Sequence, residues 1–516
     1  MAVTQFVIQA GLLTRGLEYA AVSLIIDDTY YYLQTAWNAK VLGFVTFDGL
    51  HATNGVQLLW FGIVFLLALL AKTKTILLFA TLTVNFLLNG LCYAVIIKIG
   101  AVLRQPVLAL LLAVLWALQS LPFRIYSMGM ENSLHALIFW CVIWQGVAFL
   151  LRVQVKEKPN FWGLTVVLIL LVWTRLDSAL IAILLFSFCV GMLAHSYRHN
   201  FGLFLKRHVK DMAGAGLLAG LGLSAQLIAF RLMGDSFLPI SALIKTSGAR
   251  GSDIAPIDKL AEVFVLGMPS ILQGRLPTLA LIVLGIFGVL VVILASVNMR
   301  ECPPETRAFL NLWSCLLVGE IGYYVSVALS SAEYTSYFIW YRSPSFIFWI
   351  ITGSLIALFA FGHAGLAKKT SNAVKLAPVG VSLVVFALAI YMFARSINFT
   401  SDLYAARYKA AQWIAQNSSP DTVFAAWNAG QLSFFSNRTF INLDGLINNS
   451  DYFERVLRGS VPLSEYLAEN KVAYIVDYSM YHPLPAYPVV RTFPLQDETG
   501  RSIQIWEVSP HLSSTP

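Results

Sequence analysis

The sequence predicts an α-helical polytopic membrane protein with about 11–13 transmembrane helices, followed by a small C-terminal α/β domain. Three observations lead to this prediction. Of the 516 residues, 58% are hydrophobic and only 12% are charged, against roughly 45–50% and about 25% in an ordinary soluble domain. Long apolar segments recur along residues 1–397. Beyond them the character of the chain changes.

The apolar segments are long enough, or nearly long enough, to span a bilayer as helices. Lys and Arg cluster at 152–158, 198–210, 300–307 and 368–375, after every second segment. By the positive-inside rule, this pattern predicts that all four clusters face the cytoplasm. The segments lie at 3–26, 57–71, 75–97, 106–121, 132–151, 161–174, 179–195, 212–232, 277–298, 307–329, 345–363 and 377–396.

The loops on the other side include the first outer loop, residues 27–56. Its placement requires an even number of crossings between residues 57 and 121, where three apolar segments occur. We therefore expect one of the three to be re-entrant, interfacial or broken. The polar residues and the glycine that mark the expected place are Asn85, Asn89 and Gly90.

Residues 398–516 form the second predicted domain. Charged and turn residues become more frequent there, and apolar runs shorten to strand length at 422–427, 472–478 and 502–508. An amphipathic stretch at 403–417 precedes these runs. About 115 residues suffice for an independent core, so we expect a small α/β domain outside the membrane.

Charge and cysteine content exclude several classes of protein. The formal net charge is +8, but Lys and Arg lie in short loops, where they indicate membrane orientation rather than a nucleic-acid partner. The five cysteines show no C-x-x-C spacing, so neither a disulfide scaffold nor a zinc site is indicated.

The adjacent carboxylates Asp27 and Asp28 open the first outer loop, where the first apolar segment ends. Two neighbouring acids at a membrane boundary repel each other and gain nothing from lipid, which favours a chemical role. The loop after them mixes aromatic residues with hydrogen-bonding side chains, including His51 and Asn54. This mixture suits a sugar- or headgroup-sized site, and the alternative is an aromatic belt without a ligand.

Two further outer loops carry candidate site residues. Glu131 and His135 are spaced i, i+4 and lie on one helix face, where they could bind a metal or act separately as a site acid and a packed imidazole. Arg175 and Asp177 share a tight turn. A catalytic role and a mutual salt bridge that caps the helix pair explain this turn equally well.

Lys245 follows the eighth segment, and Trp340, Tyr341 and Arg342 follow the tenth. A lysine beside an outer cavity can neutralise a phosphate oxygen, whereas a lysine at a membrane edge commonly snorkels. An arginine on the outer side runs against the positive-inside bias, which favours an anionic partner over a headgroup contact. In the C-terminal domain, turn formation explains Trp427, Asn428, Asn442, Asp444 and Gly445, which could also line the same cleft.

The order of these signatures resembles that of the GT-C superfamily of polytopic glycosyltransferases. Its bacterial arabinofuranosyltransferase-like and mannosyltransferase-like branch is the most similar. The resemblance covers nearly the whole chain, and it departs from the family pattern at R-L-D, where R-P-D or R-P-E is more typical. The signatures are D-D-T-Y-Y-Y-L-Q-T-A-W-N, F-D-G-L-H-A-T-N-G-V-Q-L-L-W, G-M-E-N-S-L, T-R-L-D-S, L-P-I-S-A-L-I-K-T-S-G and N-L-D-G-L-I-N.

The resemblance implies a membrane-embedded enzyme that takes a sugar from a polyprenyl-phosphate donor, with Asp28 or Asp27 as the general base. The acceptor is a cell-envelope glycan, a lipid or a protein. Membrane lipids surround the chain, the bacterial plasma membrane is the expected location, and the site faces outward. The residues expected to bind the donor phosphate are Arg342, Lys245, Arg175 and Tyr341, and those expected to bind the sugar or acceptor are Glu131, His51, Asn54, Trp340 and Asp177.

The chemistry fits this inventory, because a sugar phosphate already has a good leaving group. One carboxylate to take the acceptor proton and cations to hold the departing phosphate are enough. Attack from the opposite face implies inversion at the anomeric carbon. No cofactor is indicated, and a divalent cation stays open, with Asp28, Glu131 and His135 as candidate ligands. The alternatives are a transporter or flippase of lipid-linked sugars and a non-catalytic scaffold with a binding ectodomain.

Overall fold

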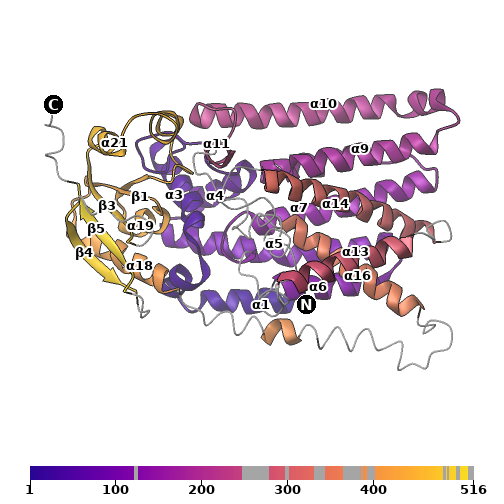
Figure 1. Ribbon diagram of the computed structural model, residues 1–516, viewed down its shortest axis with the longest axis horizontal. Coiled ribbons are helices and arrows are strands. Elements are labelled where there is room, and N and C mark those ends of the chain that lie inside the picture. Colours follow the sequence, from indigo (N-terminus) through magenta and orange to yellow (C-terminus); the bar gives the residue numbers. More distant parts are fainter. Residues whose placement is uncertain are drawn as a thin grey trace.

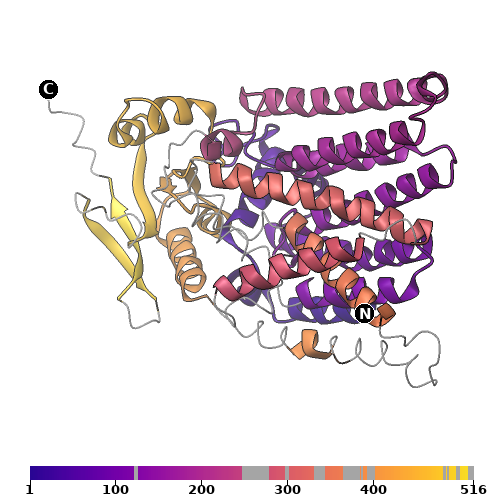
Figure 2. The ribbon, with the colours of Figure 1, turned by 45° about the vertical axis from the view of Figure 1, so that its right-hand side comes forward.

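The chain folds into a bundle of long helices and a C-terminal domain that lies at one end of it (Figure 1). Figure 2 shows the same arrangement from a second direction. We call this end of the bundle its domain side. The computed structural model describes residues 1–120, 126–246, 278–296, 302–329, 343–363, 384, 387–391, 401–479, 484, 487–495 and 500–508.

Within the described residues, most bundle helices coincide with the predicted apolar segments. The segment predicted at 3–26 is not one helix, because its first helix ends at Leu13 and Gly16, with a φ of 91°, separates this helix from the short helical turns that follow. The helices that are long and apolar enough to cross a membrane, by length and composition, are Lys74–Val102, Asn132–Gln154, Leu176–Ser196, Phe201–Gly234 and Pro304–Val325. Shorter apolar helices add to them. The elements are α1 (Ala2–Leu13), α2 (Leu17–Tyr19), η1 (Ala20–Leu24), α3 (Asp27–Leu42), α4 (Leu58–Leu70), α5 (Lys74–Val102), α6 (Pro106–Ser120), α7 (Asn132–Gln154), α8 (Phe161–Thr174), η3 (Leu176–Ser178), α9 (Ala179–Ser196), α10 (Phe201–Gly234), α11 (Ile240–Thr246), α13 (Thr278–Ser296), α14 (Pro304–Leu329) and α16 (Ser343–His363).

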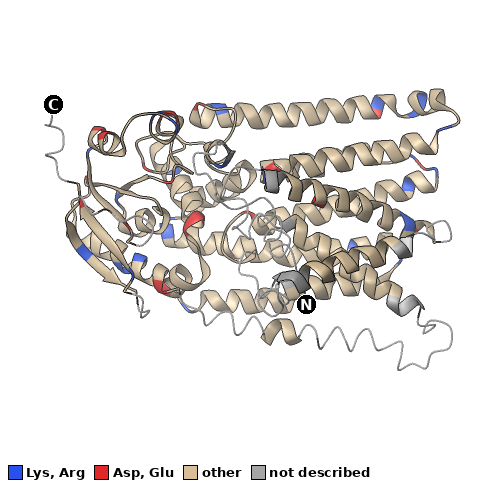
Figure 3. Cartoon of the chain, in the orientation of Figure 1, with Lys and Arg blue, Asp and Glu red and all other residues tan. Residues whose placement is uncertain are grey.

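Charged residues of the bundle concentrate towards its two ends (Figure 3). The predicted basic clusters at 152–158 and 198–210 lie together at the end away from the C-terminal domain. The Lys158 ammonium forms an ion pair with Asp211 at 2.8 Å across these clusters. Their common position agrees with the alternation that the sequence predicts.

The break expected near Asn85, Asn89 and Gly90 is wrong, because α5 continues without interruption through these residues. The first two side chains are buried inside the bundle, and the Asn85 amide donates to the carbonyl oxygen of Met130 at 2.7 Å. Polar residues in this helix are therefore used for packing against α7 and the loop before it, and not for breaking the helix.

The segment that does not cross is α4. Its N-terminal end begins beside α3, where the backbone N–H of Gln57 approaches the Tyr32 hydroxyl. Its C-terminal end returns to α3, since the Lys40 ammonium donates to the carbonyl oxygen of Ala71 at 2.6 Å. Lys74 then donates to the carbonyl oxygen of Phe434 in the C-terminal domain at 3.2 Å. Both ends of α4 thus lie on the domain side, and an even number of crossings follows.

The C-terminal domain is the predicted α/β domain, with a five-stranded mixed sheet in the order β2-β1-β3-β5-β4. Strand β1 lies between β2 and β3 and is parallel to both, whereas β5 pairs antiparallel with β3 and β4. The elements are α18 (Asp402–Asn417), β1 (Val423–Ala426), α19 (Gly430–Ser436), β2 (Thr439–Asn442), α20 (Ser450–Tyr452), η6 (Phe453–Leu457), α21 (Leu463–Glu469), β3 (Val472–Tyr478), β4 (Val489–Pro494) and β5 (Ser502–Glu507).

The loops that follow the parallel strands β1 and β2 meet the bundle. The Tyr31 hydroxyl of α3 lies 3.3 Å from the carbonyl oxygen of Trp427, just after β1. After β2, the carbonyl oxygen of Asn448 accepts a hydrogen bond from the Thr53 hydroxyl at 2.7 Å. Because carboxyl ends of parallel strands share one edge of a sheet, the two loops reach the bundle together, at the place where such sheets commonly bind ligands.

Candidate functional site

A cavity of about 50 Å³ lies where the bundle meets the C-terminal domain. Three stretches of the bundle line it together with α11 and one loop of the C-terminal domain. It therefore gathers residues from opposite ends of the sequence. The described lining residues are Asp28, Tyr31, Tyr32, Gly55, Val56, Gln57, Met130, Glu131, Ser241, Lys245, Leu446 and Ile447.

The Asp28 carboxylate faces this cavity from the first turn of α3 and is partly buried. Within the described part of the chain, no group donates a hydrogen bond to it. Burial raises its pKa to about 7, the Lys245 ammonium lowers it, and the carboxylates of Asp27, Asp444 and Glu131 raise it. A carboxylate with a pKa close to neutral and an unused acceptor is suited to take a proton.

Asp27 has a different environment from its neighbour. Its side chain is buried, and its two oxygens accept hydrogen bonds from the backbone N–H groups of Gly430 and Gln431 in the C-terminal domain, at 3.0 and 2.9 Å. Asp27 is not among the residues that line the cavity. The pair predicted from the sequence thus divides into one cavity residue and one contact between domains.

Glu131 lines the cavity and belongs to a buried ion-pair network. Its Oε1 lies 3.0 Å from Nη1 of Arg175, and its Oε2 accepts a hydrogen bond from the Tyr32 hydroxyl at 3.1 Å. Arg175 also pairs with Asp177, with Nη2 2.7 Å from Oδ2. The salt bridge between Arg175 and Asp177, one of the two explanations that the sequence leaves open, is therefore present, and Arg175 also pairs with the cavity residue Glu131.

His135, the third candidate metal ligand, packs away from the other two. Its Nε2 lies 2.8 Å from the Ser178 hydroxyl, and the residue is not among those lining the cavity. Among the residues that the structure describes, no three His, Cys, Asp or Glu side chains gather in a way that could hold a metal ion.

Lys245 reaches the cavity from α11, and Asn54 fixes the chain that leads to this helix. The Asn54 amide is 1% exposed, and its oxygen accepts the backbone N–H of Ile240, the first residue of α11, at 2.8 Å. Its nitrogen donates to carbonyl oxygens of Phe230, Ser236 and Leu238. The amide predicted to bind sugar is thus fully used inside the protein, where it holds the connection that leads to α11.

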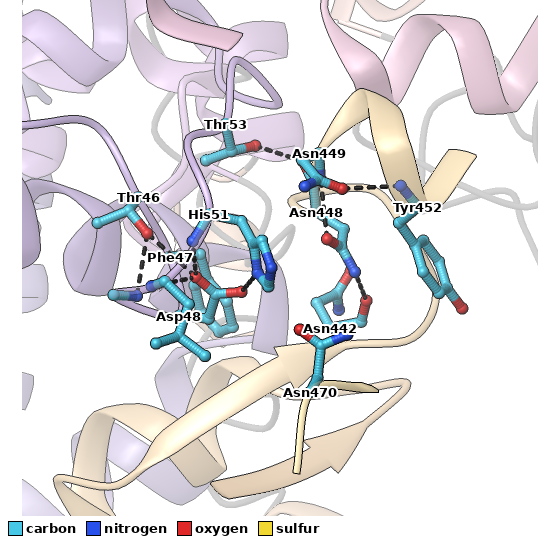
Figure 4. A network of polar contacts seen from close by, with 12 residues as sticks. Thr46, Phe47, Asp48, His51, Thr53, Asn442, Asn448, Asn449, Tyr452 and Asn470 are labelled. Carbon is cyan, nitrogen blue, oxygen red and sulfur yellow. Dashed lines mark hydrogen bonds and ion pairs between the residues drawn. The ribbon is translucent and has the colours of Figure 1, made fainter. Parts of the chain in front are cut away.

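His51 lies at the seam between the first outer loop and the C-terminal domain (Figure 4). Its Nδ1 is 2.8 Å from Oδ2 of Asp48, and this hydrogen bond raises the pKa of the imidazole. Nearby, the Thr53 hydroxyl holds the backbone of Asn448, whose amide donates to the carbonyl oxygen of Asn442 at 2.7 Å. His51 is close to the cavity without lining it.

The remaining predicted residues, Trp340, Tyr341 and Arg342, lie outside the described residues. Sequence reasoning missed the contributions of Gln57, Met130, Ser241, Leu446 and Ile447. The motif N-L-D-G-L-I-N contains the signal for the last two, because its turn residues are predicted either to form a turn alone or to line the same cleft. Its Asp444 accepts a hydrogen bond from the Tyr31 hydroxyl at 3.1 Å, which places the turn against the cavity.

Comparisons with known proteins agree with the fold. The structure is similar to that of ArnT from Cupriavidus metallidurans bound to undecaprenyl phosphate, with a TM-score of 0.55 and 14% identity over 98% of this chain and 97% of that one. The apo structure of the same protein is similar with a TM-score of 0.54 and 13% sequence identity, and the match covers 99% of both chains. A third similar structure is that of the oligosaccharyltransferase AglB from Archaeoglobus fulgidus in complex with an inhibitory peptide and a dolichol-phosphate. Its TM-score is 0.50 and its sequence identity 11%, and the match covers 100% of this chain and 75% of that one.

Fold and site together define a polytopic integral membrane protein with a small α/β domain over one end of its helices. The chain has the GT-C superfamily glycosyltransferase fold, as its sequence signatures predict, and these similarities do not distinguish between the branches of the superfamily. Residues 396–508 match a family model described as a domain of unknown function, DUF8728. No curated protein matches the chain.

Proposed function

We propose that this protein is an inverting glycosyltransferase that transfers a sugar from a polyprenyl-phosphate donor to an acceptor hydroxyl. The observation that carries the proposal is the convergence of Asp28, Glu131 and Lys245 on one cavity in a GT-C fold. The ArnT structure contains undecaprenyl phosphate and the AglB structure contains a dolichol-phosphate, which supports a lipid-phosphate donor here.

Asp28 is the general base in this mechanism. The acceptor oxygen attacks the anomeric carbon while the bond from that carbon to the phosphate oxygen breaks, and the acceptor proton moves to the Asp28 carboxylate. The lipid phosphate leaves with the bonding electrons. A single displacement from the opposite face inverts the anomeric centre.

Lys245 stabilises the charge that develops on the departing phosphate. Its ammonium lines the same cavity as Asp28 and lowers the pKa of that carboxyl. The donor phosphodiester carries one negative charge, and a second develops on its phosphate as the bond to the sugar breaks. A cation fixed beside this phosphate therefore stabilises the transition state more than the ground state. Arg175 supports this arrangement by neutralising the buried carboxylate of Glu131, and Arg342 belongs to the same proposed set of phosphate ligands.

The reaction takes place on the extracytoplasmic side of a bacterial plasma membrane. Support comes from the basic clusters at 152–158 and 198–210, which lie at the bundle end opposite the cavity, because basic loops remain in the cytoplasm. The donor enters from the bilayer, and the acceptor is a glycan, lipid or protein of the cell envelope.

A panel of polyprenyl-phosphate sugars offered to the purified protein tests this proposal. Release of free lipid phosphate from one of them, together with a product of inverted anomeric configuration, is the expected result. Asp235→Asn is the matched control, because Asp235 is an exposed acid beyond the end of α10 that pairs with Arg231. Movement of an intact donor across the bilayer without its cleavage would instead identify a transporter.

A further inference from the structure

We propose that Asp27 is a positioning residue whose carboxylate holds the C-terminal domain on α3 and so keeps the Leu446–Ile447 wall in place beside Asp28. This inference rests on the proposed function, because it assigns Asp27 a role in supporting that reaction. The two adjacent aspartates then differ in kind, since one reacts and the other joins two parts of the protein.

The contact made by Asp27 uses its whole carboxylate. One oxygen accepts the backbone N–H of Gly430 at 3.0 Å, and the other accepts the backbone N–H of Gln431 at 2.9 Å. Both donors belong to the first turn of α19, and hydrogen bonds to an ionised acceptor are roughly twice as strong as neutral ones. The Gln431 side chain adds a bond from Nε2 to the carbonyl oxygen of Ala21 at 3.1 Å. Asp27 is only 4% exposed, so the contact lies inside the protein.

The two backbones approach so closely at this point that only glycine fits at position 430. A Cβ atom on Gly430 would collide with the backbone oxygen of Asp27 and would lie 3.1 Å from both Asp27 Oδ2 and Tyr30 Cβ. Any larger residue would therefore push α19 away from α3. The residue at position 430 is thus a second point at which the same contact can be perturbed.

The buried charge of Asp27 is balanced from within the C-terminal domain. Arg407 of α18 is 3% exposed, and its Nη2 lies 3.9 Å from Oδ1 of Asp477. Burial lowers the pKa of Arg407, but the carboxylates of Asp27 and Asp477 outweigh this effect and the net shift is upward. Asp477 accepts the backbone N–H of Trp427 at 2.8 Å. A carboxylate brought in by the bundle therefore joins a buried charge cluster of the domain, and its removal would take away one of the two carboxylates that act on Arg407.

Aromatic packing surrounds this polar contact. The Tyr30 ring lies 5.2 Å from Phe434 and 5.4 Å from Phe435, between ring centroids, and Phe435 also meets Tyr408 at 4.8 Å. These rings exclude water from the neighbouring hydrogen bonds, which strengthens them.

The contact bears on the cavity in two ways. Asp28 follows Asp27 in the first turn of α3, so a displacement of one moves the other. The same domain also supplies Leu446 and Ile447 to the cavity lining, and the backbone of Leu446 approaches Gly55 so closely that a Cβ there would collide with its carbonyl oxygen. Releasing the domain would therefore alter the base and the opposite wall together.

The test uses the full-length protein with Asp27→Asn and Gly430→Ala, and with Asp28→Asn as the matched control. Hydrogen exchange of peptides covering residues 428–436 reports the contact directly. We expect exchange about tenfold faster in the first two variants, since a hydrogen bond to a charged group is worth about an order of magnitude in the opening equilibrium. Asp28→Asn leaves this contact intact and should exchange no faster than the unaltered protein.

Turnover and its pH dependence separate positioning from chemistry. We expect Asp27→Asn and Gly430→Ala to slow transfer by up to about 100-fold, the cost of misplacing a reacting group by an ångström. In both variants the rate of transfer should still fall at acid pH, in the acid limb of the pH profile that protonation of Asp28 causes. In Asp27→Asn this limb should move to lower pH, because one of the carboxylates that raise the pKa of Asp28 is lost while Asp444, Glu131 and Lys245 remain.

Two results would overturn the inference. One is slow exchange in Asp27→Asn equal to that of the unaltered protein. The other is normal exchange of residues 428–436 in Asp27→Asn together with a complete loss of transfer, because Asp27 would then be the reacting group. If Asp27→Asn does not fold, Gly430→Ala decides, because it leaves both carboxylates in place. Full activity of Asp28→Asn would contradict the proposed function instead, and the exchange result would still decide the role of Asp27.

Discussion

Replacement of Asp28 by Asn is expected to stabilise the protein while it removes the proposed base. The carboxyl group has a pKa of about 7 in the folded chain, against an ordinary value of 3.8, and burial is the main cause. At pH 8 the folded protein must therefore hold an ionised group that is better solvated in the unfolded chain. The difference between the two pKa values corresponds to about 4 kcal/mol, which Asn does not incur.

The added stability of Asp28→Asn should depend on pH, and this dependence identifies the raised pKa of Asp28 as its origin. Because the folded chain binds the Asp28 proton more tightly than the unfolded chain, the stability of the unaltered protein falls as the pH rises from about 4 to about 7. At pH 5 the folded carboxyl is already protonated, and the advantage of Asn shrinks to about 1.5 kcal/mol. Thermal unfolding followed by tryptophan fluorescence at both pH values measures the two gains.

The reasoning predicts a higher unfolding temperature for Asp28→Asn at pH 8 and a smaller rise at pH 5. Asp235→Asn should change neither, because Asp235 is exposed and its ion pair with Arg231 is at the surface. Equal shifts at the two pH values, or a loss of stability at pH 8, would refute the claim that burial raises the pKa of this carboxyl.

Three further outcomes follow from the site. Transfer should rise with pH through a midpoint near 7, because Asp28 must be ionised to accept a proton; a flat profile of kcat/KM would contradict this. Arg175→Met should destabilise the protein by about 3–5 kcal/mol by leaving a buried carboxylate unpaired, whereas Arg231→Met at an exposed pair should cost at most about 1 kcal/mol; chemical denaturation compares them. Asn54→Ala should raise the KM for the donor, because the connection leading to Lys245 loses its hydrogen bonds, and an unchanged KM would exclude this role.

Much of the fold could be predicted because its signals are local. Apolar length and basic loops indicated the helices, and strand-length runs indicated the C-terminal domain. The convergence of Asp28, Glu131 and Lys245 could be expected because all three lie in loops assigned to one side of the membrane. The resemblance to the GT-C superfamily rested on the same loops, and the structure confirms that fold.

The remaining features depend on contacts between distant parts of the chain. Asp27 meets Gly430 across 403 residues, and no local pattern distinguishes it from Asp28. The amide of Asn54 looked available for a sugar, but its partners lie 176 to 186 residues away. The course of α4 was also missed, because an apolar segment of 13 residues has the same composition whether it crosses the bilayer or returns to the same side.

The most direct test of the central claim compares the unaltered protein with Asp28→Asn in a single assay of lipid phosphate released from a polyprenyl-phosphate sugar. Folding of the variant is verified beforehand by its unfolding temperature. We expect release by the unaltered protein and a loss of at least about 100-fold in the variant, the usual contribution of a general base. Release by Asp28→Asn at a rate within a few-fold of the unaltered protein would contradict the central claim.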